Sequence, residues 1–444
     1  MIRFLHTVFI KKRFFQIIIG IIVLFVFSYF LEILFPVTKI LLFTLILITL
    51  FDYFLLYKVK NGVHGVRFTP EKLSNGDENP LRIYLENRYA FKADIEVIDE
   101  IPHQFQVRNI SFSLQIQSRA NKNIDYTLRP VKRGEYDFGA VNVFVSSPLG
   151  LAARRFKFSE NKLVPVYPSY IQMRKYELMA ISNQLTEYGI KKIRRIGHNM
   201  EFEQIKEYVQ GDDVRTINWK ATARKNQLMV NNFQDERSQQ VYCLIDKGRM
   251  MQMPFRGMTL LDYAINASLV ISNIAIKKDD KAGLITFQHK IGDVLPAGKR
   301  NNQMFRIQET LYKQKTAFKE PDFSRLYAFV KSAIRQRSLL LLFTNFESKV
   351  SLERQLRFIS SLARSHVVVV IFFENTELDD LLNSEAKTVK EIYYKGIAEK
   401  FAYEKRLVVK ELNMHGVHTI LTKPEDLTVN TINKYLELKA RGLI

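Results

Sequence analysis

The chain has 444 residues, with 66 lysines and arginines against 45 aspartates and glutamates, and a formal net charge of +21. That length leaves room for about two or three domains with large cores, so folding need not depend on a metal or on disulfides. The single cysteine, Cys243, excludes an internal disulfide and suits a reducing compartment. The positive charge fits nucleic acid, anionic lipid or an acidic protein as a partner, and it does not choose among them.

Residues 1–60 predict a membrane anchor. Two apolar segments, Phe14–Phe35 and Val37–Tyr57, each have roughly the 20 residues that a helix needs to cross the hydrocarbon layer. Pro36 lies between them, where a helix is expected to break or turn. The sequence therefore predicts two antiparallel transmembrane helices. A signal peptide fits poorly, because its apolar region is shorter and a small-residue cleavage site should follow it.

Basic residues on both sides of this pair predict its orientation. Arg3 and Lys11–Arg13 precede the first segment, and Lys58, Lys60 and Arg67 follow the second. Both flanks are expected in the cytoplasm, because cytoplasmic segments carry an excess of lysine and arginine. The rest of the chain would then be cytoplasmic as well.

Residues 63–165 predict an Ig-like antiparallel β-sandwich. Short runs with a period of two recur at regular intervals and are separated by turn residues. The expected strands are Leu81–Glu86, Ala93–Ile98, Phe112–Gln117, Asp125–Arg129 and Ala140–Val145. Ser147-Pro-Leu-Gly-Leu reads as a turn that closes the sandwich. No catalytic constellation is visible, so a packing or interaction module is expected.

Residues 166–237 contain the most unusual stretch of the chain, a dense mixture of acids and bases around its one tryptophan, Trp219. Phe202, Ile205 and Tyr208 recur at helical spacing. Asp212-Asp213 then stands where a cap would begin a short helix, Val214–Arg224. In this interpretation the carboxylates cap and pair with the bases Arg215, Lys220 and Arg224.

Two other interpretations of this stretch stay open. In the first, Glu207, Asp212 and Asp213 hold a divalent metal for hydrolysis. Against it, the interleaved lysines and arginines would neutralise these carboxylates. Alternatively, a nucleic-acid single strand would stack on Trp219 while nearby bases neutralise its phosphates. The bases Lys191, Lys192, Arg194 and Arg195 would also attract anionic lipid.

Several motifs together resemble one family. Glu201-Phe, Glu207-Tyr, Gly211-Asp-Asp-Val-Arg, Ile217-Asn-Trp-Lys-Ala-Thr-Ala-Arg and Phe233 through Glu236 are similar to the signature of the domain of unknown function 58 family of bacterial membrane-associated proteins. Lys132-Arg-Gly-Glu-Tyr-Asp-Phe-Gly and Ser147-Pro-Leu-Gly-Leu also resemble it. The resemblance implies a von Willebrand factor A-like domain, a place in the bacterial inner membrane, and a MoxR-type AAA+ ATPase as neighbour and partner.

Residues 238–444 predict a doubly wound α/β domain. Continuous apolar runs are typical of strands buried on both faces, and helical patterns lie between them, so a parallel sheet is expected. The strands are Val241–Ile245, Ala282–Phe287, Ser338–Phe343, His366–Phe373 and Val417–Thr422. The helices are Leu260–Lys277, Asn302–Lys313, Phe323–Arg335, Leu352–Arg364, Val389–His415 and Leu427–Leu438. Ligands of such folds bind at the carboxyl ends of the strands, here at Asp246 and Thr344-Asn345.

This pattern resembles a von Willebrand factor A domain, whose metal site is similar to Asp-x-Ser-x-Ser completed by a threonine and an aspartate. Here the loop reads Asp246-Lys-Gly-Arg-Met, so both serines are replaced, and Asn345 stands where the second aspartate is expected. Mg²⁺ needs near-octahedral oxygen coordination. We therefore expect Asp246 to pair with Lys247, Arg249 or a backbone N–H group instead of binding a metal.

The sequence as a whole predicts a non-enzymatic, membrane-anchored cytoplasmic scaffold or adaptor without a cofactor. Its parts are two transmembrane helices (1–60), a β-sandwich (63–165), the signature segment (166–237) and an A-type domain (238–444). The expected partner-docking or organising residues are Glu207, Asp212, Asp213, Arg215, Trp219, Lys220 and Arg224. A nucleic-acid or anionic-lipid binding protein and a metal-dependent hydrolase are the alternatives.

Overall fold

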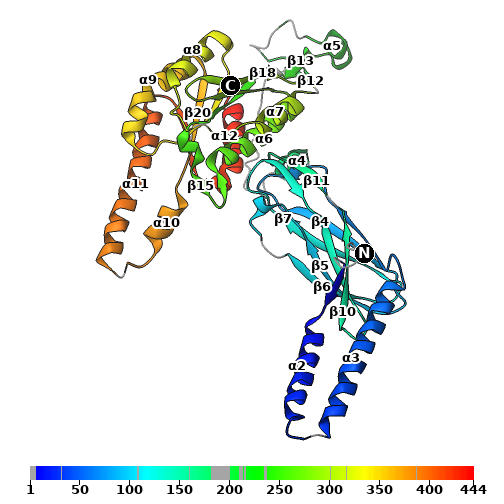
Figure 1. Ribbon diagram of the computed structural model, residues 1–444. Coiled ribbons are helices and arrows are strands. Elements are labelled where there is room, and N and C mark those ends of the chain that lie inside the picture. The colour runs from blue at the N-terminus through cyan, green and yellow to red at the C-terminus, as the bar shows by residue number, and fades with distance from the viewer. Residues whose placement is uncertain are drawn as a thin grey trace. The chain divides into compact units, whose positions relative to one another are not determined.

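The computed structural model describes residues 7–31, 33–107, 110–159, 161–181, 201–209, 214, 217–234, 238–300, 302–316, 318–386 and 388–444. The chain divides into two compact units, Met1–Tyr167 and Pro168–Ile444 (Figure 1). Sheets and helices are both present in several groups, as the sequence predicts.

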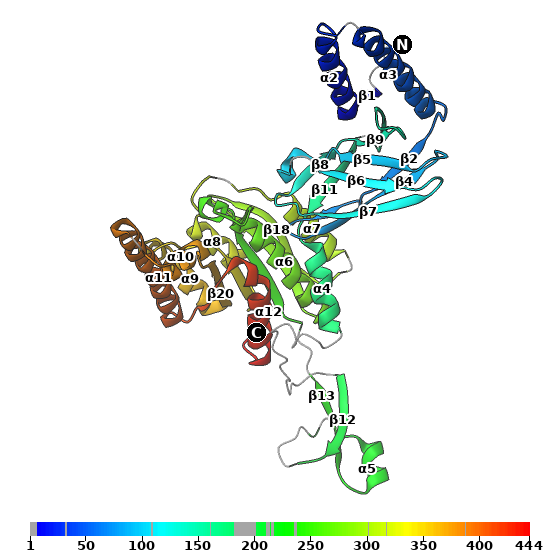
Figure 2. The same cartoon turned by 90° about the horizontal axis from the view of Figure 1, so that it is seen from below.

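The first unit begins with two helices that lie side by side (Figures 1 and 2), α2 (Lys12–Phe27) and α3 (Leu34–Tyr57). The expected break at Pro36 is wrong, because α2 already ends at Phe27. Pro36 lies in the first turn of α3, where its missing N–H group costs no helical hydrogen bond. The first apolar segment therefore forms a helix of 16 residues, shorter than expected.

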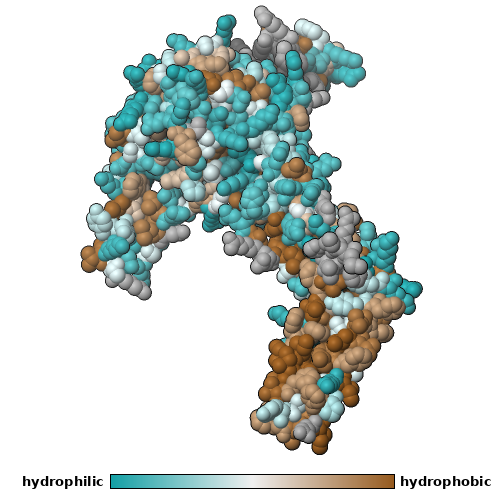
Figure 3. Space-filling view, viewed as in Figure 1, coloured by the Kyte–Doolittle hydropathy of each residue, from teal (hydrophilic) through white to brown (hydrophobic). Residues whose placement is uncertain are grey.

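Two helices among the described residues are long and apolar enough to cross a membrane, α3 and α6 (Leu260–Lys277). The apolar window of α6 is 83% buried, so α6 is a core helix of the second unit, whereas that of α3 is 17% buried. Figure 3 shows the hydrophobic surface of the N-terminal helices as a brown region. The composition and exposure of α3 are consistent with membrane association.

The first unit also contains three β-sheets, whose strands all follow the helices except β1. Their orders are β1-β10-β9-β5-β6, β2-β4-β7 and β3-β11-β8. The strands are β1 (Val8–Ile10), β2 (Val63–Phe68), β3 (Leu73–Ser74), β4 (Asn79–Asn87), β5 (Ala93–Asp99), β6 (Ser111–Ile116), β7 (Asn121–Leu128), β8 (Gly134–Phe138), β9 (Val141–Ser146), β10 (Ala152–Phe158) and β11 (Lys162–Tyr167). Burial alternates along β4 as its period of two predicts. Ile83 and Leu85 of β4 share one core with Ile95 of β5 and Val143 of β9, so two sheets pack face to face.

Arg67 differs from its expected role as a cation flanking the membrane. Its side chain is buried in this unit, where Nη1 lies 2.5 Å from Oδ1 of Asp99. Nη2 also donates to the carbonyl oxygen of Gly139, at 2.9 Å. The charge of Arg67 is thus compensated inside the protein.

The second unit is built on a six-stranded sheet of order β18-β17-β14-β19-β20-β21. All neighbours pair in parallel except β17 and β18. The strands are β14 (Gln240–Asp246), β17 (Lys281–Phe287), β18 (Ile291–Gly298), β19 (Leu339–Phe343), β20 (Val367–Phe373) and β21 (His418–Thr422). The five predicted strands are confirmed. Sequence reasoning missed β18, an antiparallel edge strand in which only Leu295 is buried.

Helices cover both faces of this sheet (Figure 1). They are α6, α7 (Gln303–Tyr312), α8 (Phe323–Ala333), α9 (Lys349–Ser365), α11 (Val389–Met414) and α12 (Leu427–Ala440), with α4 (Tyr170–Ile181) packed on α6 and α10 (Thr376–Asn383) packed on α11. Along β14, Cys243 belongs to the core under α6, whereas Leu244 belongs to the core on the other face. Burial on both faces is why these strands are continuously apolar.

Candidate functional site

The signature segment contains a β-hairpin where helical spacing was expected. Strand β12 (Glu201–Glu207) pairs antiparallel with β13 (Met229–Gln234), and the register shifts between Phe202 and Gln204. This bulge brings Phe202 opposite Phe233 and Ile205 opposite Asn231, two positions that are two residues apart on β13. Because a bulge adds one residue, a spacing of three fits a bulged strand as well as one face of a helix. The helical interpretation of this stretch is therefore wrong.

A short helix, α5 (Trp219–Lys225), follows within the segment, and it begins later than expected. Its cap is Asn218, whose Oδ1 accepts the N–H of Ala221 at 3.0 Å, and not Asp212-Asp213. Asn218 also donates through Nδ2 to Oδ1 of Asn231 on β13, at 2.8 Å. The expected site residues Asp212, Asp213 and Arg215 lie outside the described residues.

Two polar residues of the motif fasten α5 to β13. Besides the cap, the backbone N–H of Asn218 donates to the carbonyl of Met229 at 2.8 Å, and the N–H of Met229 donates to Oγ1 of Thr222 at 3.0 Å. Met229 itself is buried. The polar residues Asn218 and Thr222 therefore hold the segment together.

Three larger side chains of the motif are exposed to solvent. Trp219 is 70% exposed, and Lys220 and Arg224 are exposed on the same short helix. Among the described residues, no ion pair joins either cation to a carboxylate, and Glu207 of β12 is also exposed. The segment thus exposes an aromatic ring and cations on a helix that hydrogen bonds hold to β13. Exposed tryptophan and arginine side chains are typical of binding surfaces.

The second candidate region is the carboxyl end of β14. Asp246 is 1% exposed, and its Oδ2 accepts the hydroxyl of Thr344 at 2.7 Å while its Oδ1 accepts the backbone N–H of Gly248 at 2.7 Å. Burial raises the pKa of Asp246 to about 6, although both hydrogen bonds act to lower it. Of the partners expected for Asp246, the structure has the backbone N–H group. Lys247 instead donates to Oε1 of Gln314, at 3.0 Å.

Asn345 has a partner that sequence reasoning missed. Its Oδ1 lies 3.2 Å from Nζ of Lys405, which also donates to the carbonyl oxygen of Phe373. Burial lowers the pKa of Lys405 to about 8, against the attraction of Glu347 and Glu374. Lys405 stands sixty residues further along the chain, in the middle of α11. No local spacing in the sequence relates it to the strand end.

The donor set at this edge does not fit a divalent metal. In the described part of the chain, no three His, Cys, Asp or Glu side chains converge on one point. A Cβ atom on Gly248 would lie 2.8 Å from Cδ of Pro321 and 2.9 Å from Oδ1 of Asp246, so the missing serine hydroxyl has no room at this position. One carboxylate, one hydroxyl and one amide are too few for Mg²⁺.

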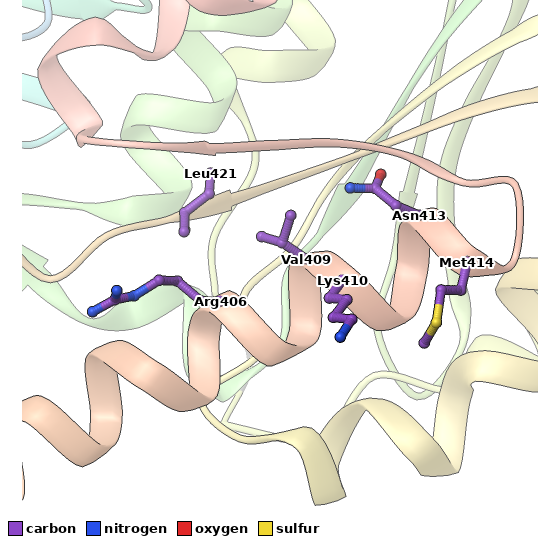
Figure 4. Close-up of a pocket in the computed structure, with 6 residues that line it drawn as sticks. All are labelled: Arg406, Val409, Lys410, Asn413, Met414 and Leu421. Carbon is purple, nitrogen blue, oxygen red and sulfur yellow. The ribbon is translucent and has the colours of Figure 1, made fainter.

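An open groove of about 660 Å³ lies along the C-terminal half of α11 (Figure 4). Its lining consists of Arg406, Val409, Lys410, Asn413, Met414 and Leu421. The groove joins two cations to an apolar floor, but its lining has no acid, histidine or cysteine that would support acid–base or nucleophilic chemistry.

Residues 204–381 match the family described as "Protein of unknown function DUF58". This match begins within β12 and ends within α10. The chain is also 29% identical over 131 residues to the uncharacterized protein YeaD of Bacillus subtilis (strain 168), a stretch that spans 29% of this chain and 32% of that relative. The chain is therefore matched to about a third of the length of YeaD.

Among solved structures, the chain is similar to the ASH/PapD-like domain 7 of human CEP192, at 14% identity and a TM-score of 0.19. That similarity covers 24% of this chain and 87% of that domain. A CARDB domain from Pyrococcus furiosus is 10% identical, covers 24% of this chain and 94% of its own, and has a TM-score of 0.19. Scores this low carry no conclusion about fold or function.

Proposed function

We propose that this protein is a membrane-anchored scaffold or adaptor that docks a protein partner through its signature segment, without catalysis. The observation that carries the proposal is Trp219, 70% exposed on a helix that Asn218 and Thr222 fasten to β13. Leaving a tryptophan in water forgoes a large favourable burial, and tryptophan and arginine dominate the binding energy of protein interfaces. A ring held on a fixed support loses little conformational freedom when a partner covers it.

The exposed cations favour a partner with an acidic surface. Lys220, Arg224 and Lys225 follow Trp219 on the same short helix, and each is exposed. Positive charge beside an aromatic contact residue steers an acidic protein and raises its association rate. The family resemblance supplies a candidate, a MoxR-type AAA+ ATPase.

The other parts of the chain are proposed to be a von Willebrand factor A-like domain, a β-sheet spacer and a membrane anchor. The strand order with an antiparallel edge strand, and the position of Asp246 and Asn345 at the carboxyl ends of β14 and β19, favour a von Willebrand factor A-like domain whose metal site is degraded. The sheets of the first unit are proposed to form an Ig-like β-sandwich that acts as a spacer. Helices α2 and α3 are proposed to anchor the chain in the inner membrane of a bacterium, with the soluble parts in the cytoplasm.

A direct binding assay tests the proposal. The purified full chain in detergent is immobilised, and the affinity for the purified MoxR-type ATPase from the same genome is measured for wild type, Trp219→Ala and the matched control Phe318→Ala. Phe318 is 75% exposed in the same unit but lies outside the signature segment. We expect Trp219→Ala to weaken binding by about tenfold or more, as an interface hot spot does. Equal affinity of wild type and Trp219→Ala would refute the docking role.

The same exposed tryptophan beside cations also favours one second function, the binding of single-stranded nucleic acid. That function predicts affinity for an oligothymidine that falls steeply with salt, because phosphate contacts release counterions. It also predicts that Lys220→Ala and Arg224→Ala each reduce the salt dependence. Salt-independent or absent binding would remove this alternative.

A further inference from the structure

The turn between β9 and β10, Ser147-Pro-Leu-Gly-Leu, supports a charged residue of α3. Asp52 interrupts the apolar sequence of α3, and its side chain is fully buried. Its carboxylate accepts the hydroxyl of Ser147, the N–H of Leu151 at 3.3 Å and the N–H of Leu149 at 3.4 Å. A carboxylate in a lipid-facing helix is tolerated only where protein groups satisfy it. The turn supplies these hydrogen-bond donors, so the turn must lie at the same depth in the membrane as Asp52.

Packing places the same turn between the two helices. Leu151 is buried in one cluster with Ile21 of α2 and Leu45 of α3. Gly150 has a φ of +75°, and a Cβ atom there would lie 3.0 Å from Nη1 of Arg13, which α2 contributes. The turn therefore contacts both helices at once, and its glycine serves the close approach.

The connections between the helices and the sheets are hydrogen-bonded on both sides. Before α2, β1 pairs with β10, and Lys11 donates its N–H to the carbonyl of Leu151 at 2.9 Å. After α3, the guanidinium of Arg154 on β10 donates to the carbonyls of Leu56 at 2.8 Å, Val59 at 2.9 Å and Lys60 at 2.8 Å. These bonds satisfy one carbonyl in the last turn of α3 and two carbonyls just after the helix. The sheets of this unit are thus fixed to the helices instead of hanging from a flexible linker.

Apolar side chains are exposed around this junction. Leu149 is 48% exposed at the tip of the turn, and Phe9 and Ile10 of β1, the strand that pairs with β10, are exposed as well. Lys12 and Lys58, at the ends of α2 and α3 that adjoin the sheets, are also exposed. Apolar residues next to cations match the boundary between acyl chains and anionic headgroups.

We propose that the turn Ser147–Leu151, with Phe9 and Ile10 of β1, is seated in the interfacial layer of the bilayer, so that the first unit is held rigidly against the membrane surface. The partner is the lipid bilayer itself, and the surface is continuous with α2 and α3. This inference rests on the membrane anchoring contained in the proposed function. It assigns a role to the Ser147-Pro-Leu-Gly-Leu motif, which the docking function leaves unexplained.

Depth-dependent fluorescence quenching tests whether the turn Ser147–Leu151 lies in the interfacial layer. Cys243→Ser removes the only native thiol, and single cysteines at Leu149, Leu163 and Phe43 are labelled with an environment-sensitive fluorophore. Leu163 is the matched control, an exposed leucine of β11 in the sheet that does not contain β1. The full chain is placed in vesicles of phosphatidylethanolamine and phosphatidylglycerol that contain lipid brominated either near the glycerol backbone or near the acyl chain end.

We expect the Leu149 label to lose fluorescence with the shallow bromines more than with the deep ones, and the Leu163 label to be unaffected by both. The Phe43 label, exposed in the middle of α3, should respond to the deep bromines. A quenched Phe43 label with an unquenched Leu149 label would refute the interfacial position of the turn but not the membrane anchoring by α2 and α3. An unquenched Phe43 label would refute both proposals.

Discussion

Thr344 donates its hydroxyl to the buried carboxylate of Asp246, with Oγ1 2.7 Å from Oδ2, and so joins the ends of β19 and β14. This carboxylate keeps its proton up to a pH of about 6 in the folded protein because burial raises its pKa, whereas the ordinary value is 3.8. Between these two values the folded state binds more protons than the unfolded state. The stability contributed by this group is therefore fully present below pH 3.8 and is lost as the pH rises through 6.

Asp246→Asn should remove that pH dependence, because the amide can accept from Gly248 and donate to Thr344 without a charge. The difference between the two pKa values corresponds to roughly 3 kcal/mol of unfolding free energy in all, of which about 2 kcal/mol is lost between pH 4 and pH 7. Hydrogen exchange of β14 peptides at these two pH values, corrected for the intrinsic exchange rate, measures it in both proteins. An equal change in protection in wild type and Asp246→Asn would contradict the assignment.

The same edge of the sheet is expected to bind no divalent metal with useful affinity. Asp246 already has two hydrogen-bond donors, and Gly248 leaves no room for a hydroxyl ligand. Isothermal titration with Mg²⁺ and with Mn²⁺ should give only the heat of dilution. Saturable binding that disappears in Asp246→Ala would show that the site retains a metal.

Asn218 and Trp219 are adjacent, but substituting one should lower stability and substituting the other should not. Asn218→Ala removes the cap of α5 and the bond to Asn231, and loss of such a cap costs about 1 kcal/mol. Trp219→Ala removes an exposed ring and should leave stability nearly unchanged. Hydrogen exchange of the β13 peptide separates the two: faster exchange is expected in Asn218→Ala alone. Faster exchange in Trp219→Ala would mean that the ring stabilises the fold and is not free to bind a partner protein.

These cases show which features the sequence determines. The apolar run Val241–Ile245 and the helical pattern Leu260–Lys277 predict β14 and α6, because burial on both faces and a period of 3.6 are local properties. Trp219, Lys220 and Arg224 are identified as a candidate surface, and their exposure agrees with it. Local sequence patterns therefore predict most of the helices and strands of the second unit.

Other features depend on distant residues and could not be derived in the same way. Strand β1 is three residues long and pairs with β10 across more than 140 residues. Lys405 reaches Asn345 from the middle of α11, and the bulge in β12 imitates helical spacing. Each depends on a pairing that no short window of sequence contains. The same is true of the contact between Asp52 and the turn at Ser147.

The buried thiol of Cys243 should be inert in the native protein. Burial raises its pKa to about 12, although the contact with the hydroxyl of Ser272 on α6 acts to lower it. The thiolate is the reactive form, so maleimide should not modify the folded chain at pH 8 and should modify it fully in denaturant. Mass spectrometry of the two samples measures this. Rapid labelling of the native protein would mean that β14 opens readily.

The ion pair between Arg67 and Asp99 should be the most costly to break in the first unit. Both side chains are almost fully buried, and Asp99 also accepts the hydroxyl of Tyr126. Arg67→Met leaves this carboxylate without its cation and should lower the unfolding free energy by about 3–5 kcal/mol, because an uncompensated buried charge remains. Urea unfolding of the full chain in detergent, followed by circular dichroism, measures the loss.

Removing the charge as well provides the matched control for this pair. The double variant Arg67→Met with Asp99→Asn should recover part of the lost stability, because no charge remains to be buried and the amide oxygen can still accept the hydroxyl of Tyr126. The exposed pair of Arg82 and Asp125 offers a comparison in the same unit, and Arg82→Met should cost less than about 1 kcal/mol. A similar small loss for Arg67→Met would mean that water reaches Asp99, and that the pair does not organise the core.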